Sequence, residues 1–219
     1  HEPSVKNWID DFKTKFNISE VDFYLNAISK LRISLVGEVI LDQYTQVEAL
    51  GKSSKDPILA FHIGKSELYA GGVLAIANNC ASWVDEVKVY SIIGFNDDRP
   101  IDLAKILNSQ IKLTLFQAQK PTITKHRYID SGTNSKVFET YDFDPNELSE
   151  DDISHFLKNL ESISESDLVL VADYGHGLLT KSVIKKVIDD SNFLAVNTQA
   201  NAGNRGFNTL TKYEQLDFF

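Results

Sequence analysis

Residues that could bind a hydroxyl-rich small molecule stand at four places in this sequence, each after an apolar run or before a helical segment. These places are Glu38 with Asp42, Gly71-Gly72, Asp173, and Asn197. Carboxylates and amides accept hydrogen bonds from hydroxyl groups such as those of a sugar, and paired glycines let a polar ligand reach backbone N–H groups. Each place alone could be no more than a turn or a helix cap. The four together predict one polar pocket.

The elements expected to position these residues alternate between apolar strands and helices. Short apolar runs predict strands at 33–37, 87–93, 168–172 and 193–196. Helices are expected over 72–84, 100–107, 150–160 and 180–188. This alternation predicts an α/β sandwich with a mostly parallel sheet. Ligands of such sheets bind in the crevice at the carboxyl ends of the strands, which is where the four polar places would meet.

Two further regions, 44–64 and 111–143, are rich in β-forming residues and lack helical spacing. Residues 121–129 and 136–143 predict a hairpin around Ser131-Gly132-Thr133-Asn134. We therefore expect a small, partly exposed β sheet, called the lid below, inserted into the core.

Two helices are predicted before the first strand. One covers 3–16, and the other opens with a capping box formed by Ser19 and Asp22. Residues 1–31 are therefore interpreted as a helical linker or docking segment ahead of a domain at 32–219.

Composition and charge exclude several classes of protein. The 219 residues are 42% hydrophobic and carry 31 acidic against 22 basic side chains, a formal charge of −9. This length and apolar content fit one domain, or slightly more, with a real core. The acidic balance argues against nucleic acid or an anionic membrane as the main partner, and no apolar run is long enough for a membrane span. The single cysteine, Cys80, excludes internal disulfides and a thiolate metal cluster, and fits a cytoplasmic location.

The common catalytic signatures are missing from the sequence. It contains no G-x-x-x-x-G-K-[ST], no G-x-G-x-x-G and no G-x-S-x-G. Its five histidines show no metal-binding spacing, so no metal site is predicted. The chain begins with His1 and has no methionine, so we expect either a piece of a longer protein or a sequence from which modified methionines were omitted.

The order and spacing of the motifs resemble those of the ribokinase, or PfkB, carbohydrate kinases, and within them the heptose phosphate kinase branch most of all. The matching stretches, spread over about residues 32–219, are Gly37-Glu38-Val39-Ile40-Leu41-Asp42-Gln43-Tyr44, Gly71-Gly72 followed by Ala77 and Asn79, Pro121-Thr122-Ile123-Thr124-Lys125-His126-Arg127, Asp142-Phe143-Asp144, and Asp173-Tyr174-Gly175-His176-Gly177. The resemblance implies a ribokinase-like three-layer sandwich whose lid covers a sugar. It also implies ATP and Mg as cofactors, with ATP donating its γ-phosphoryl group to a sugar hydroxyl.

The resemblance assigns roles to particular residues. The implied substrate-binding residues are Glu38, Asp42, Gly71, Gly72, Asn79, Lys125, Arg127, Asp173 and Asn197. Asp42 would hold sugar hydroxyls over a floor formed by the glycine amides, and Asn79 would support that floor. Lys125 and Arg127 could meet a phosphate already on the sugar, or could be solvent-facing strand charges. Relatives often pair through the lid, so a homodimer is implied as well.

Several departures from the family pattern bear on function. Glu38 and Asn197 stand where aspartate is usual, Ala75 replaces an asparagine, and His176 replaces a lysine. The family's late Gly-Ala-Gly-Asp-like stretch, which supplies the catalytic base and an anion hole, has no counterpart after Asp173.

These departures leave two functions open. We expect the sugar-binding, amino-terminal two-thirds of a kinase domain, with no catalytic residue of its own, most of the nucleotide site beyond Phe219, and no phosphoryl transfer by this chain alone. The alternative is a non-catalytic, degenerate kinase-fold module that senses a sugar or assembles partners. An NAD-dependent Rossmann enzyme is disfavoured because its phosphate-binding fingerprint is missing.

Overall fold

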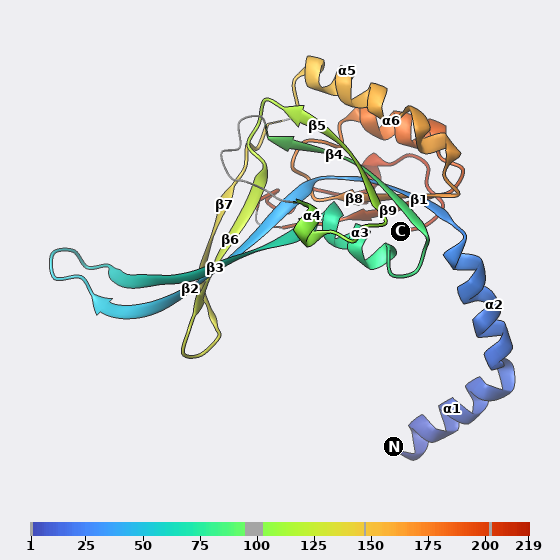
Figure 1. Ribbon diagram of the computed structural model, residues 1–219, viewed down its shortest axis with the longest axis horizontal. Helices are drawn as coiled ribbons and strands as arrows, with labels where there is room; N and C mark the ends of the chain where they lie inside the picture. The colour runs from blue at the N-terminus through green and yellow to red at the C-terminus, as the bar shows by residue number, and fades with distance from the viewer. Residues whose placement is uncertain (1, 95–102, 147, 202) are drawn as a thin grey trace.

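Five parallel strands form the central sheet of the computed structural model, which describes residues 2–94, 103–146, 148–201 and 203–219. The strands lie in the order β5-β4-β1-β8-β9 (Figure 1). Their bounds are β1 Arg32–Gly37, β4 Glu86–Gly94, β5 Ile111–Ala118, β8 Leu168–Asp173 and β9 Leu194–Thr198. The parallel pairing of all five confirms the predicted fold class.

Helices cover both faces of this sheet because its central strands are apolar on both sides. In β1, Leu35 packs into a core cluster with Leu74 of α3, whereas Val36 belongs to a second cluster with Phe156 of α5 and Val187 of α6. The helices are α3 Val73–Cys80, α4 Leu103–Ile106, α5 Glu150–Asn159 and α6 Lys181–Asp190, with short 3-10 turns η1 Glu161–Glu165 and η2 Leu210–Lys212. These agree with the predicted helices, except that residues 100–102 lie outside the described residues.

A second sheet of four strands, in the order β3-β2-β6-β7, extends to one side of the core and is the predicted lid (Figure 1). Its strands are β2 Val39–Lys52, β3 Leu59–Gly72, β6 Ile123–Asp130 and β7 Lys136–Asp142. The predicted hairpin is therefore confirmed as β6–β7. The region 111–143 is divided between the two sheets, however, because β5 pairs along its whole length with β4 in the core.

The chain passes from the core into the lid over a single residue, Glu38, which lies between β1 and β2. It returns at Gly72, which ends β3 and caps α3. Because Val39 and Gly72 are directly paired, the base of the lid is fixed against the carboxyl end of β1. Asp42 and Gly71 lie close to this junction.

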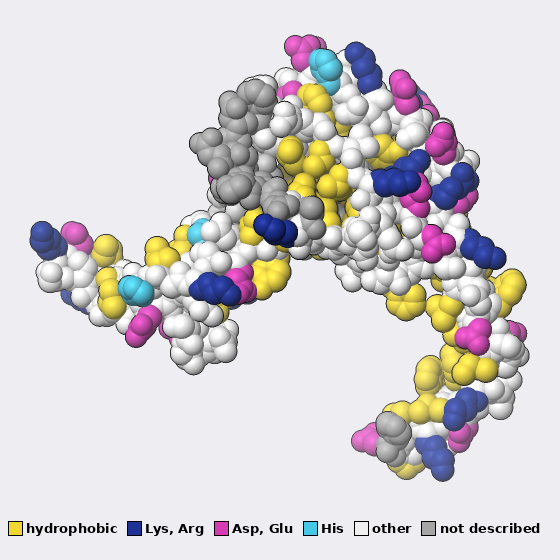
Figure 2. Space-filling view, in the orientation of Figure 1, with side chains coloured by type: hydrophobic (Ala, Val, Ile, Leu, Met, Phe, Trp, Pro, Cys, Tyr) yellow, Lys and Arg dark blue, Asp and Glu magenta, His cyan; other side chains and the backbone are white. Residues whose placement is uncertain are grey.

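Two amino-terminal helices, α1 Pro3–Lys15 and α2 Ile18–Ser29, extend away from the core and contain no buried residue (Figure 1). The capping box of α2 is formed by Asn17 and Glu20, two residues earlier than the predicted pair Ser19 and Asp22. Hydrophobic side chains, among them Trp8 and Phe23, lie exposed along both helices (Figure 2). Within the described ranges, no helix has the length and apolar character needed to cross a membrane.

Candidate functional site

Asp42 and Gly71 meet at the base of the lid. Antiparallel pairing of β2 with β3 places Gly71 opposite Ile40, and the Asp42 carboxylate lies against the Gly71 Cα. A methyl group at Gly71 would overlap Oδ2 of Asp42 and come within 2.9 Å of the Ile40 carbonyl oxygen. The absence of a side chain at this glycine therefore makes room for the carboxylate.

Arg127 on β6 neutralises Asp42 from the neighbouring strand. Its guanidinium donates to Oδ1 of Asp42, and its Nε lies 3.5 Å from Oε2 of Glu139. Burial alone would lower the pKa of Arg127, but the hydrogen bond and charge of Asp42 outweigh it and raise that pKa. The Arg127 guanidinium also lies over the ring of Tyr44, 5.3 Å from its centroid.

Lys125 is the buried cation of the site. It is 9% exposed, and its ammonium lies between two aromatic rings, 5.7 Å from the centroid of Tyr141 and 5.9 Å from that of Tyr174. Burial lowers the pKa of Lys125, although the nearby Asp42 carboxylate opposes the shift. Among the residues that the structure describes, no ion pair or hydrogen bond of this ammonium is present. An anionic group of a ligand would supply the missing partner.

Glu38, predicted to bind substrate, is buried at the junction of core and lid and is bonded to the backbone in the structure. Its side chain is fully buried, and its two carboxylate oxygens accept the backbone N–H groups of Tyr174 and His176 at 2.9 and 3.1 Å. Burial, together with the charge of Asp173, raises the pKa of Glu38 to about 7. The extra methylene relative to aspartate lets this carboxylate hold the loop that follows β8.

Asp173, also predicted to bind substrate, has internal partners in the structure. Its side chain is fully buried; Oδ2 accepts from the Tyr213 hydroxyl at 2.6 Å and pairs with Lys212 at 2.5 Å. Oδ1 accepts from Gly175 and Asn208. These bonds occupy both carboxylate oxygens and join the loop after β8 to the segment that follows β9.

His176 is 4% exposed, and within the described part of the chain neither of its ring nitrogens has a hydrogen-bond partner. Its ring packs edge-on against Phe143, with 5.1 Å between the centroids. The backbone of Gly203 covers another side, since a methyl group there would lie 2.8 Å from Cε1 of the imidazole. Burial, reinforced by the charge of Lys125, lowers the pKa of His176 to about 4.

Two predicted substrate residues lie apart from this group. Asn79 is exposed near the end of α3, where its amide donates to the Ala75 carbonyl of the same helix at 3.0 Å. Asn197 is exposed on β9, paired with Ala172. The structure thus groups Asp42, the glycine pair, Lys125 and Arg127, and does not bring the two asparagines to them.

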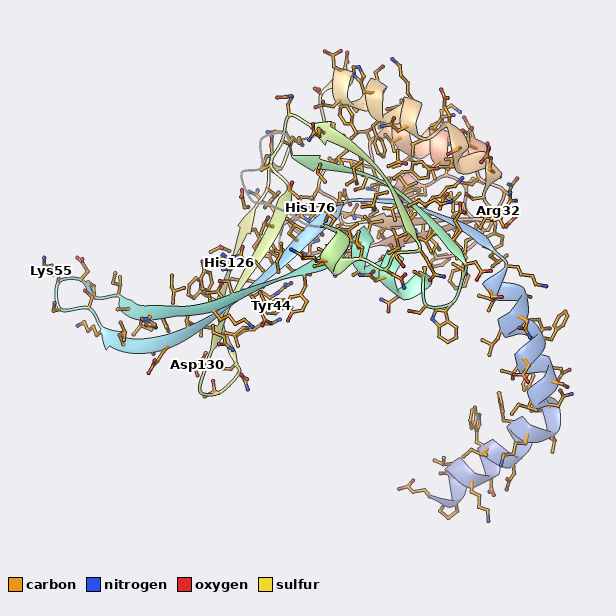
Figure 3. The ribbon with its side chains drawn as sticks, in the orientation of Figure 1. Arg32, Tyr44, Lys55, His126, Asp130 and His176 are labelled. Carbon is orange, nitrogen blue, oxygen red and sulfur yellow. The ribbon has the colours of Figure 1, made fainter. Side chains whose placement is uncertain are left out.

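Two hollows open beside this group. One, of about 520 Å³, lies on the face of the lid that carries Asp42 and is lined also by Tyr44, Glu67 and Tyr69. The other, a crevice of about 610 Å³, lies over the carboxyl end of β8 and is lined by Tyr141, Phe143, Gly175, Gly177 and Gly203, with Arg205 and Lys212 among its other residues. Tyr44, on the lid, and His176, at the junction of lid and core, are both labelled in Figure 3.

Curated proteins similar to this chain include several that are named Bifunctional protein HldE. The Bifunctional protein HldE of Nitratiruptor sp. is 30% identical over 164 residues, which cover 74% of this chain and 35% of that protein. HldE of Syntrophotalea carbinolica is 24% identical over 173 residues, or 78% of this chain and 35% of that protein. This chain therefore spans about a third of the length of these relatives. No known protein-family profile matches it.

Solved structures with the same fold include phosphofructokinases. Phosphofructokinase-2 of Escherichia coli in complex with fructose-6-phosphate superimposes with a TM-score of 0.56 at 12% identity, covering 78% of this chain and 56% of that one. A possible 1-phosphofructokinase of Thermotoga maritima superimposes with a TM-score of 0.55 at 14% identity, covering 77% and 54%. This chain is a homologue of HldE with the fold of the PfkB-family sugar kinases.

In this PfkB-type chain, the sequence motifs located the base of the lid but missed the aromatic side chains around it. Tyr141 and Tyr174 flank Lys125, and Phe143 covers His176. The contact of Tyr141 with Lys125 could have been predicted from the strand register of the hairpin, because β6–β7 pairing places the two residues opposite each other. The internal partners of Asp173, by contrast, come from residues 208–213, far along the chain.

Proposed function

We propose that this chain is the sugar-binding portion of an ATP-dependent carbohydrate kinase that acts on a sugar phosphate. The observation that carries the proposal is the arrangement at the base of the lid, where a carboxylate and a buried, unpaired ammonium lie on adjacent strands. Asp42 on β2 is in register with Lys125 on β6. A carboxylate accepts hydrogen bonds from sugar hydroxyls, whereas an ammonium attracts a phosphate.

The ion pair between Asp42 and Arg127 gives the site a way to respond to ligand. With no sugar present, Arg127 neutralises the carboxylate, which is 23% exposed. A sugar hydroxyl that donates to Asp42 would compete with this pair and leave Arg127 free to contact an anionic substituent of the same molecule. The stacked Tyr44 ring would hold the guanidinium nearby in either position.

ATP use is part of the proposal because the homologue and the structural neighbours are related to sugar kinases. Fructose-6-phosphate, which is bound in the structure of one neighbour, supports a sugar phosphate as the class of substrate. Within the described residues, no group of three or more His, Cys, Asp or Glu side chains is arranged to hold a metal ion. No magnesium site is therefore assigned to these residues.

Binding of fructose 6-phosphate, measured by titration calorimetry, tests this proposal. Asp42→Asn should weaken binding at least tenfold, since the amide keeps the shape but loses the charge and one hydrogen-bond acceptor. The matched control is Asp142→Asn, an exposed carboxylate on β7 of the same lid, which should leave the affinity unchanged. Equal affinities of Asp42→Asn and wild type for every sugar phosphate tried would contradict the proposal.

A second candidate is a non-catalytic module that binds a sugar phosphate as a sensor or an assembly element. The observation in its favour is that Glu38 and Asp173, two of the carboxylates matched to kinase motifs, are both fully buried in internal hydrogen bonds. An assay of sugar-dependent ATP consumption separates the candidates. Turnover that is lost in Asp42→Asn favours the kinase, and tight binding without turnover favours the module.

We also propose that the chain forms a homodimer through the outer face of its lid. The rings of His126, Tyr128 and Phe138 stack in a row, with 4.2 Å between successive centroids, and Phe61 lies 6.3 Å beyond. Alternation along β6 places His126 and Tyr128 on the face opposite Lys125 and Arg127. Phe138 and Ile63 are 44% and 65% exposed, so a second lid could bury an apolar surface there.

A further inference from the structure

The unpartnered imidazole of His176 requires an explanation. A buried polar group without a hydrogen bond costs free energy, so native proteins rarely keep one without a ligand or an ordered water. Both ring nitrogens of His176 are in this position. The loop that carries the residue is not loose, because Glu38 accepts the His176 backbone N–H at 3.1 Å. The side chain is therefore held in place with its hydrogen-bonding capacity unused.

The charged groups around His176 favour an anion as its missing partner. Lys125, whose ammonium is also unpaired among the described residues, depresses the pKa of the imidazole, and Asp173 opposes that effect. Both oxygens of Asp173 are already occupied by Tyr213, Lys212, Asn208 and Gly175. Glu38 holds the backbone of this loop, and Asp144 and Lys120 line a small gap beside the imidazole. Lys120 itself donates to the Asn146 carbonyl.

Space for an anion lies next to the residues that contact or flank the imidazole. Phe143 and Gly203 contact the His176 ring, and Gly175 and Gly177 flank it in the chain. All four line the crevice of about 610 Å³. Phe143 both contacts the His176 ring and lines the crevice, whereas His176 itself does not line it. Contact between an anion in the crevice and the imidazole would therefore require the Phe143 side chain to move. By contrast, the small gap on its other side holds about one water molecule at most.

We propose that His176 and Lys125 together form a phosphate-binding site at the base of the crevice, and that the His176 imidazole takes up a proton from solvent when the phosphate group binds. The ammonium and the resulting imidazolium N–H would both donate to phosphate oxygens. Without an anion, a second positive charge beside Lys125 is disfavoured and the imidazole is neutral. A bound dianion reverses this preference, since an opposite charge within about 4–6 Å favours the charged form. This inference rests on the proposed sugar phosphate substrate. That proposal alone, however, gives His176 no role.

Histidine NMR on the whole chain tests the site, with sulfate as a probe that stays a dianion between pH 4 and 8. Saturating sulfate should raise the pKa of His176 by at least one unit. As the pH falls and the imidazole becomes protonated, the affinity for sulfate should then rise about tenfold for each unit of that shift. The exposed His62 should not respond. A comparison of fructose 6-phosphate with fructose shows whether the anion is the phosphate of the sugar. Fructose 6-phosphate should raise the pKa of His176 as sulfate does, and fructose should not. A shift with sulfate alone would assign the site to a phosphate from another molecule.

Two variants identify the group that takes up the proton. The His176→Gln variant should bind sulfate more weakly, and its affinity should not rise at low pH. In Lys125→Gln, sulfate should no longer raise the pKa of His176. Glu38 also titrates in this range, but it is retained in His176→Gln. A pH dependence that persists in that variant, or an unchanged His176 pKa in wild type at saturating sulfate, would overturn the inference. If fructose 6-phosphate binds in a way that requires Asp42 but neither it nor sulfate shifts the pKa of His176, the proposed function stands and this inference fails.

Discussion

The contact between Asp42 and Gly71 shows how a residue without a side chain can define a binding site. The carboxylate occupies the volume that a Cβ at Gly71 would take, and the strand pairing of β2 with β3 prevents the two from separating. Asp42 can then face the hollow on the lid while Arg127 holds it from the adjacent strand. The position of the Asp42 carboxylate therefore depends on the absence of a side chain at Gly71.

We therefore predict that Gly71→Ala weakens the binding of fructose 6-phosphate at least tenfold and destabilises the chain by about 1–3 kcal/mol, the usual cost of overpacking. Calorimetric titration and urea unfolding measure the two effects. Gly64→Ala on the same strand is the matched control, because a Cβ there would meet nothing closer than 3.4 Å. If the two variants bind ligand equally well, the displacement of Asp42 by the new methyl group has no effect on the site.

The buried carboxylate of Glu38 predicts a pH dependence of stability. Its pKa is raised to about 7 in the folded chain, against about 4.3 for an unfolded glutamate. The folded state then holds a proton that the unfolded state releases, so this stabilisation is present at low pH and is lost as the pH rises through about 7. The loss amounts to about 3 kcal/mol between pH 4.5 and 8.

Urea unfolding of wild type and Glu38→Gln at pH 5 and pH 8 checks this prediction. The free energy of unfolding of wild type should fall relative to that of the variant as the pH rises. His176, whose pKa is lowered to about 4, changes stability in the opposite direction between about pH 4 and 6.5, but it is present in both proteins and cancels in the comparison. A difference that does not change with pH would mean that Glu38 keeps an ordinary pKa.

At the scale of strands and helices, local sequence pattern predicted most of the core. Apolar runs located β1, β4, β8 and β9, because a strand covered on both faces must be apolar throughout. The same reasoning placed β5 within a lid region, since β-rich sequence does not reveal which strand is its partner. The capping residues of α2 were misplaced by two positions, because Asn17 and Ser19 are both acceptable caps.

The candidate site was predictable only where residues close in sequence or strand register bring groups together. Asp42 and the glycine pair were found because motifs marked them, and β2–β3 pairing then joined them. Burial was not predictable in the same way. Glu38 and Asp173 became internal groups because their partners lie elsewhere in the chain, at 174–176 and at 208–213 respectively. A carboxylate at the end of a strand can therefore hold a neighbouring loop by internal hydrogen bonds, and its presence alone does not indicate a ligand-binding residue.

Over the whole molecule, the lid has two faces that suit different partners. Its inner face carries the charged residues Asp42, Lys125 and Arg127, whereas its outer face carries the aromatic row from His126 to Phe138. Figure 1 shows that the β2–β3 hairpin projects well beyond the core, so its outer end receives no cover from the chain's own helices. Leu50 and Leu59, near the end of this hairpin, are 67% and 68% exposed. An isolated lid of this shape would leave a large apolar surface in water.

We predict that the wild-type chain sediments as a dimer at micromolar concentration and that Ile63→Glu converts it to a monomer. The buried charge would have no partner in a lid-to-lid interface, and such an unpaired charge costs several kcal/mol. Thr140→Glu is a second disruptive variant. It places the same charge on the exposed β7, next to the β6 strand position of His126, and should weaken the dimer as well if the whole outer face is buried. Trp83→Glu, which alters an exposed apolar residue of the core, should leave the dimer intact. Wild-type chain that remains monomeric at high concentration would show that the outer face of the lid is not a dimer interface.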